Sequence, residues 1–112
     1  TPQELSLSPR LSRRAEADLD EVWLSTALMT SSEVAADRVF NLVWEAIDRL
    51  VAFPRMGHRR DDTPEHMLAW NVDDGWTIVY EPREGTIGIS RILRSTRDFE
   101  ALTQTDFPRA ER

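Results

Sequence analysis

The sequence predicts an α+β domain, in which a helical hairpin packs on one face of a mostly antiparallel four-stranded sheet and a short helix ends the chain. Two long amphipathic segments come first, and three short apolar segments separated by turn residues follow them. Helices and strands that are segregated along a chain are typical of this class. For a chain of 112 residues we expect a single domain over 1–112, with loose ends at 1–3 and 105–112.

A short strand and then a helix are expected near the beginning of the chain. Leu5, Leu7 and Leu11 alternate with polar residues, which indicates a strand. The helix should begin near Ser12, whose side chain can cap it, and run to about Met29. Its apolar face repeats at helical spacing and comprises Ala15, Leu19, Val22, Trp23 and Ala27.

A second amphipathic helix is expected from Glu33 to Phe53. Residues 30–32, Thr-Ser-Ser, interrupt the first pattern and offer caps for this helix. Pro54 ends it, because the residue before a proline avoids the helical conformation. Two such helices joined by a short turn form a helical hairpin. The second apolar stripe comprises Ala36, Val39, Phe40, Val43, Ala46, Ile47, Leu50 and Val51.

Three strands are expected after a polar loop, at Met67–Val72, Trp76–Tyr80 and Thr86–Leu93. Residues 73–75, Asp-Asp-Gly, and 82–85, Pro-Arg-Glu-Gly, supply the turns between them. Ser95 or Thr96 could cap a final short helix. The apolar residues of that helix would be Phe99, Ala101 and Leu102.

Composition and charge exclude several classes of protein. The chain has no cysteine, which excludes a disulfide scaffold and thiolate metal sites. Its net charge of −6 makes it a poor general nucleic-acid binder, so we expect no direct DNA binding by the chain alone. No apolar run approaches the roughly 20 residues of a membrane helix, and we expect a cytoplasmic protein without membrane contact. The polar loop contains four possible metal ligands, namely Asp61, Asp62, Glu65 and His66. Their spacing does not match that of a known metal site, so we expect neither a metal nor a cofactor.

An arginine cluster stands at the end of the last expected strand, where Arg91, Arg94 and Arg97 are spaced three residues apart. Arginine binds carboxylates and phosphates through two parallel hydrogen bonds, so the cluster is a candidate site for an anion or a partner. Arg94 and Arg97 lie beyond the centre of the strand, and for them partner contact and plain exposure are both open. Trp70 would be a further anchor for a partner if it faces away from the helices.

Arg91 is expected to form a structural ion pair. Strand alternation places it on one face with Ile87, Ile89 and Leu93, in an apolar layer where a guanidinium must be paired. A functional role for this arginine is the alternative. The candidate carboxylates are Asp18, Glu16 and Asp98.

Four motifs in this order resemble the RelE/ParE superfamily of bacterial toxin–antitoxin toxins. The residues of these motifs are more similar to those of the ParE branch, whose members are often labelled plasmid stabilization proteins. Together the motifs span about residues 5 to 102. They are Leu-Ser-Arg-Arg-Ala-Glu-Ala-Asp-Leu at 11–19, Leu-Val-Ala-Phe-Pro-Arg-Met-Gly at 50–57, Trp-Thr-Ile-Val-Tyr at 76–80 and Ile-Ser-Arg-Ile-Leu-Arg-Ser-Thr-Arg-Asp at 89–98.

The resemblance implies a toxin that is neutralised by a cognate antitoxin encoded beside it. The antitoxin would carry a flexible segment that wraps the toxin and folds on binding. In the ParE branch the implied target is DNA gyrase, which the toxin inhibits without hydrolysing a substrate. In the RelE branch the toxin cuts messenger RNA on the ribosome. This chain departs from ParE-like sequences at two positions, because Arg94 stands where histidine is usual and Leu68 where a basic residue is usual.

The residue types favour an inhibitor over a nuclease. Metal-independent RNA cleavage needs groups that accept and donate a proton beside cations at the phosphate. Here the only tyrosine, Tyr80, lies in a strand, His58 and His66 lie in a loop, and lysine is absent. These residue types predict no catalytic residues, and the resemblance to the ParE branch then implies a gyrase inhibitor. A ribosome-dependent mRNA endoribonuclease is the alternative, and a non-toxic member that only binds an antitoxin is a third possibility.

Overall fold

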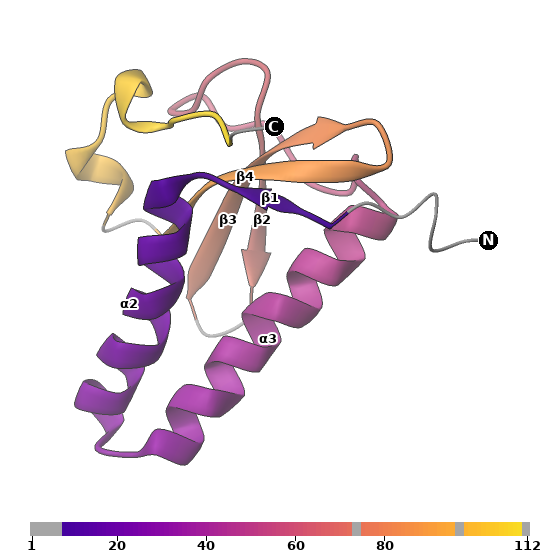
Figure 1. Ribbon diagram of the computed structural model, residues 1–112. Helices are drawn as coiled ribbons and strands as arrows, with labels where there is room; N and C mark the ends of the chain where they lie inside the picture. Colours follow the sequence, from indigo (N-terminus) through magenta and orange to yellow (C-terminus); the bar gives the residue numbers. More distant parts are fainter. Residues whose placement is uncertain (1–7, 73–74, 96–97, 111–112) are drawn as a thin grey trace.

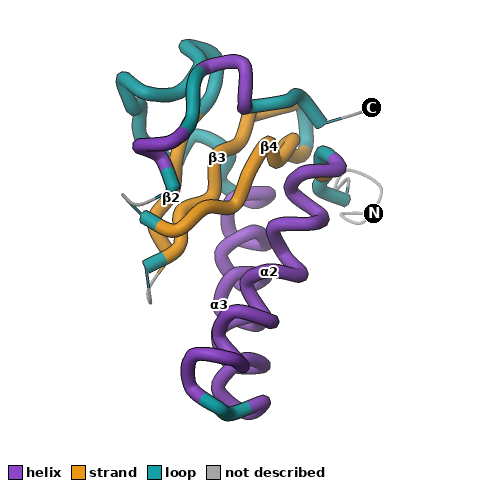
Figure 2. Tube along the Cα trace, turned by 90° about the vertical axis from the view of Figure 1, so that its left-hand side faces the viewer, coloured by secondary structure: helices purple, strands orange, loops and turns teal. Residues whose placement is uncertain are grey.

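The computed structural model describes residues 8–72, 75–95 and 98–110. Two helices lie side by side as a hairpin against one face of a four-stranded sheet (Figure 1), which confirms the predicted α+β class. The connecting end of the hairpin extends beyond the sheet (Figures 1 and 2). The elements are β1 (Arg10–Leu11), α2 (Arg13–Thr30), α3 (Glu33–Ala52), β2 (Leu68–Val72), β3 (Trp76–Arg83), β4 (Thr86–Arg94) and the 3-10 turns η1 (Phe99–Ala101) and η2 (Gln104–Asp106).

Serine side chains begin both helices, as the sequence predicts. The Ser12 and Ser32 hydroxyls each accept a hydrogen bond from a backbone N–H three residues on, at 3.0 Å. Ser31 between the helices has φ 54°, a left-handed conformation that turns the chain sharply. α3 ends at Ala52, one residue before the predicted end, because Pro54 follows so closely.

The sheet has the strand order β1-β4-β3-β2 and is mixed, because β1 runs parallel to β4 while the other pairs are antiparallel. The described part of the first strand is only Arg10–Leu11. The Leu5 and Leu7 positions of the predicted strand lie outside the described residues. Gly75, with φ 88°, turns the chain from β2 into β3 as the predicted hairpin requires.

A β-bulge in β4 changes the predicted alternation. Val79 pairs with Arg91, but the next residue of β3 pairs with Ile89, so Ser90 is an extra residue on β4. One extra residue moves every later side chain to the other face. Ile92 therefore joins the helix-side core with Ile87 and Ile89, while Leu93 packs on the opposite face. The expectation that residues 87, 89, 91 and 93 share one face is thus wrong.

The chain's own C-terminal segment, residues 98–110, covers the back face of the sheet, opposite the helices (Figure 2). Phe99 and Phe107 stack with ring centroids 6.2 Å apart, and Arg60 lies over the Phe99 ring. Phe107 and Ala110 are only 5% and 6% exposed, so residues 105–110 are not the loose end that was predicted. In place of one short helix the segment forms two 3-10 turns. The back-face cluster comprises Met67, Val79, Leu93, Phe99 and Phe107.

Candidate partner-binding site

Arg91 forms a buried ion pair with Asp18 of α2. Its Nε donates to Asp18 Oδ2 at 2.8 Å and its Nη2 to Oδ1 at 3.2 Å, a two-pronged contact. The side chains are 6% and 12% exposed. Asp18 Oδ2 also accepts the backbone N–H of Ile92 at 2.9 Å, at an edge of β4 that the two-residue strand β1 does not reach. Both charges are therefore used inside the fold.

Glu16 and Asp98, the other two carboxylates predicted as possible partners of Arg91, do not pair with it, and Asp98 is bonded to the backbone. Its Oδ2 accepts the backbone N–H of Arg94 at 3.0 Å, so it secures the end of β4 and not the Arg91 guanidinium. The bulge places Arg91 opposite Val79 of the back-face cluster, and from there its guanidinium reaches the Asp18 carboxylate of α2 and the Asp106 carbonyl. Arg97 lies outside the described residues.

Arg94 is held in place by neutral side chains. Its guanidinium carbon lies 4.9 Å from the centroid of the Trp76 ring, and its Nη2 donates to Met29 Sδ at 3.2 Å. Within residues 8–72, 75–95 and 98–110, no carboxylate forms a salt bridge with it. The cation is thus positioned without being neutralised by that part of the chain.

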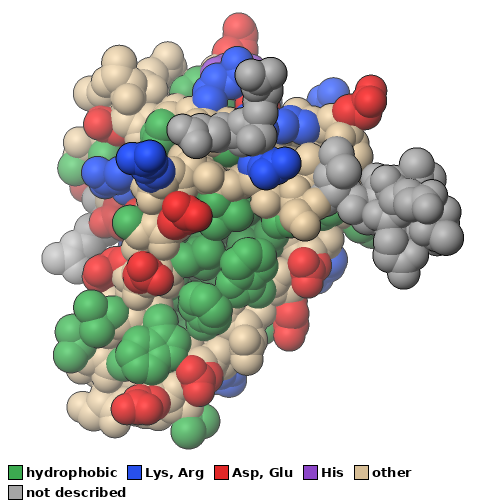
Figure 3. Space-filling view, in the orientation of Figure 1, with side chains coloured by type: hydrophobic (Ala, Val, Ile, Leu, Met, Phe, Trp, Pro, Cys, Tyr) green, Lys and Arg blue, Asp and Glu red, His purple; other side chains and the backbone are tan. Residues whose placement is uncertain are grey.

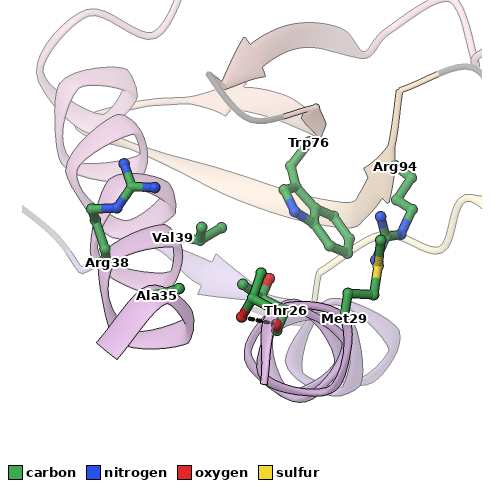
Figure 4. A pocket seen from close by; sticks show the side chains of 8 residues that line it. Thr26, Met29, Ala35, Arg38, Val39, Trp76 and Arg94 are labelled. Carbon is green, nitrogen blue, oxygen red and sulfur yellow. Dashed lines mark hydrogen bonds between the residues drawn. The ribbon is translucent and has the colours of Figure 1, made fainter. Parts of the chain in front are cut away.

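A cavity of about 200 Å³, here called the Arg94 pocket, opens between the hairpin and the end of the sheet. Arg38 of α3 and Arg94 of β4 lie on opposite sides of it, and the Trp76 indole lies between them (Figure 4). The rest of its wall is apolar or hydroxyl-bearing. Its described lining residues are Thr26, Met29, Thr30, Ala35, Arg38, Val39, Trp76 and Arg94.

Trp70 does not face away from the helices. It is half-buried and packs against the helix-side core, beside Leu42 and Arg49 of α3. β2 pairs Trp70 with Ile78, a residue of that same core, so the pleat directs the indole to the helical layer. The geometry assumed for Trp70 as an exposed anchor is therefore wrong.

Tyr80, His58 and His66 are not among the described residues that line the Arg94 pocket. The buried Tyr80 hydroxyl donates to the Pro54 carbonyl at 2.7 Å and accepts the Gly57 N–H at 2.9 Å. Burial raises the pKa of Tyr80 above its ordinary value. His66 Nε2 lies 3.9 Å from a Glu81 carboxylate oxygen, and His58 is exposed in the loop that bridges to β2. The described residues include no cluster of three or more possible metal ligands.

Sequence reasoning missed the partners of Arg94. Trp76 and Arg94 are directly paired across β3 and β4, so counting outward from the turn at 82–85 could have brought them together. The bulge at Ser90 shifts the register by one residue, so this counting gives the correct pair only if the bulge is taken into account. Met29 and Arg38 come from the helices, and nothing in their local sequence indicates that they meet the end of the sheet.

The fold defines a small α+β protein, and its Arg94 pocket is lined by two arginines and by no described histidine, tyrosine or carboxylate. The model of the family described as the ParE toxin of the type II toxin–antitoxin system parDE matches residues 10–99, and the chain belongs to this family. The resemblance predicted from the four motifs is thereby confirmed.

One solved structure with this fold is described as the chromosomal ParDE TA system from P. aeruginosa. It matches with a TM-score of 0.68 and 19% sequence identity, over 81% of this chain and 98% of that chain. The comparison with curated proteins gave no match. None of the helices in the described ranges combines the length and the apolar character needed to cross a membrane.

Proposed function

We propose that this ParE-family toxin acts in the cytoplasm by binding and inhibiting DNA gyrase, and that a cognate antitoxin neutralises it. Membership of the family over residues 10–99 supports the toxin class. The observation that carries the mode of action is the Arg94 pocket, where a cation, an indole and a thioether are gathered without any described histidine, tyrosine or carboxylate in the wall. Such a surface binds a partner and has no group to move a proton.

Binding is favoured over RNA cleavage by the use of the other polar groups. The Arg91 cation is neutralised by Asp18, and the Tyr80 hydroxyl is occupied by two backbone groups. A nuclease would need such groups free at the scissile phosphate. The net charge of −6 also opposes approach to the highly anionic ribosome.

The proposed contact residues are Arg94 and Arg97, together with the apolar end of the hairpin. Leu28 and Val34 at that end are 72% and 80% exposed, which is unusual for large apolar side chains. Exposed apolar side chains that lie close together, as Leu28, Met29 and Val34 do around the turn between the helices, favour a surface that another macromolecule covers. A partner that covers them would bury Arg94 as well, since Met29 contacts it.

The test is a gyrase supercoiling assay with the purified toxin, with and without the protein encoded by the adjacent reading frame. Inhibition that the adjacent protein relieves is the expected result. A translation extract supplied with a defined transcript tests the nuclease in parallel. Toxicity in cells with unchanged supercoiling and cut transcripts would refute the proposal. Harmless expression without the antitoxin would instead indicate the non-toxic member of the fold.

A further inference from the structure

We propose that the Arg94 pocket takes up one apolar side chain of the antitoxin, and that Arg94 and Arg38 pair with acidic residues next to it in that segment. The partner chemistry is thus an acidic peptide with an apolar anchor. This inference rests on the proposed neutralisation by an antitoxin. It adds the position of the contact and the type of residue that makes it.

Arg94 is pre-positioned for a carboxylate. The Trp76 ring and the Met29 sulfur both contact the guanidinium, while neither of them neutralises its charge. An arginine already restrained in this way loses little conformational entropy when it forms a two-pronged pair. Arg38 lies across the pocket, so carboxylates on both sides of an inserted side chain would each find a cation (Figure 4).

The size of the pocket favours a single side chain as the occupant. Its volume of about 200 Å³ is below the roughly 300–1,000 Å³ of pockets that hold whole small ligands. Ala35, Val39, Met29 and Trp76 form the apolar part of its wall. A complete nucleotide does not fit such a space, whereas a leucine or phenylalanine side chain does.

Charge complementarity selects an acidic segment at this position. The chain carries a net charge of −6, and acidic side chains surround the exposed hydrophobic ones over the hairpin (Figure 3). An acidic peptide is therefore repelled from much of the surface and attracted where Arg38 and Arg94 line the pocket without a described carboxylate in its wall. The apolar contact surface continues outward from the pocket, because Met29 of its wall is 72% exposed and Leu28 and Val34 are similarly open.

The experiment measures the dissociation constant of the antitoxin, produced from the adjacent reading frame, for toxin variants at several salt concentrations. Arg94→Ala should weaken binding about ten- to hundredfold, because it leaves a carboxylate of the antitoxin unpaired in the interface. The dissociation constant of Arg94→Lys should lie between those of wild type and Arg94→Ala, since lysine keeps the charge but cannot form two parallel hydrogen bonds with a carboxylate. Ala35→Phe fills the pocket and should weaken binding with every arginine intact. Arg13→Ala, an exposed arginine of the first turn of α2, is the matched control.

A reciprocal scan identifies the acidic residue. Each carboxylate of the antitoxin's flexible segment is replaced in turn by its amide. One such replacement should raise the dissociation constant for wild-type toxin but leave the dissociation constant for Arg94→Ala toxin unchanged. Raised salt should weaken the wild-type complex more than the Arg94→Ala complex. Thermal unfolding of each variant shows that it is folded, and Ala35→Phe tests the same pocket if Arg94→Ala is unstable.

The inference is overturned if wild-type toxin binds the antitoxin while Arg94→Ala and Ala35→Phe bind within about twofold of Arg13→Ala. It is also overturned if Arg94→Ala weakens the binding of a fluorescent single-stranded oligonucleotide to the toxin but leaves the binding of the antitoxin unchanged. Failure of wild-type toxin to bind the antitoxin refutes the proposed neutralisation and this inference with it. The gyrase assay, which uses toxin alone, reports separately on the proposed target.

Discussion

Replacing Arg91 with alanine should lower the free energy of unfolding by about 3 kcal/mol. Removing one partner of a buried ion pair costs about 3–5 kcal/mol, because the other charge is left buried and unpaired. The lower end applies here, since Asp18 is 12% exposed and still accepts the Ile92 N–H. An entropy of unfolding of about 2.1 cal/mol/K per residue over 112 residues converts this loss into a fall in melting temperature of about 13 °C.

Thermal and urea unfolding, followed by circular dichroism, measure the loss. The free energy of unfolding of Arg91→Lys should lie between those of wild type and Arg91→Ala, because lysine keeps the charge but not the second hydrogen bond. Asp18→Asn should also be intermediate, since the amide oxygen can still accept from Ile92. Arg13→Ala is the control, because that arginine is exposed. An Arg91→Ala variant that melts within about 3 °C of wild type would refute the view that the pair is a buried structural element.

The remaining predictions concern the buried tyrosine, the hairpin turn and the C-terminal segment. Burial raises the pKa of Tyr80, so the folded chain keeps the phenolic proton after the unfolded chain has lost it; stability is then fully present below about pH 10 and falls above it. Without lysine or cysteine no other side chain titrates there, so urea unfolding of Tyr80→Phe should lack this fall, and a matching slope in both proteins would contradict the assignment. Ser31→Gly should raise stability by about 0.5–1 kcal/mol in urea titrations, because it relieves a left-handed φ; a loss would show that the serine side chain outweighs the strain. Phe107→Ala should cost about 3 kcal/mol and increase binding of an apolar dye, whereas an unchanged unfolding midpoint would mean that the tail adds nothing to the core.

The layers of the fold follow from local sequence. The spacing of apolar residues in 13–52, with Ser12 and Ser32 as caps and Pro54 as the stop, predicts both helices within about one residue. The turn glycines Gly75 and Gly85 predict the hairpins in the same way, since both adopt positive φ. These signals lie within a few residues of the structure that they cause, which is why they can be recognised without coordinates.

The site depends on contacts that local sequence does not encode. One extra residue at Ser90 decides which way Arg91 faces, and Gly88, two residues earlier in β4, does not define the position of that bulge. Strand alternation alone leaves open which face of the sheet Trp70 occupies, because the face that the helices cover is set by the packing of the whole chain. The Arg94 pocket combines residues about 65 positions apart, as the Arg94–Met29 contact shows.

The C-terminal segment decides which surfaces remain for a partner. The match to the ParE family ends at residue 99, and beyond it Phe107 and Arg109 continue across the back of the sheet. Arg109 Nη2 donates to Glu81 at 2.6 Å, and Arg83 Nη2 donates to the Ala110 carbonyl at 2.7 Å, so the segment is tied down at its far end. Covering the back-face cluster in this way removes an apolar sheet face that a partner could otherwise bind. A partner of the proposed kind would therefore bind at the hairpin end, where exposed Leu28, Met29 and Val34 lie and where Met29 contacts Arg94.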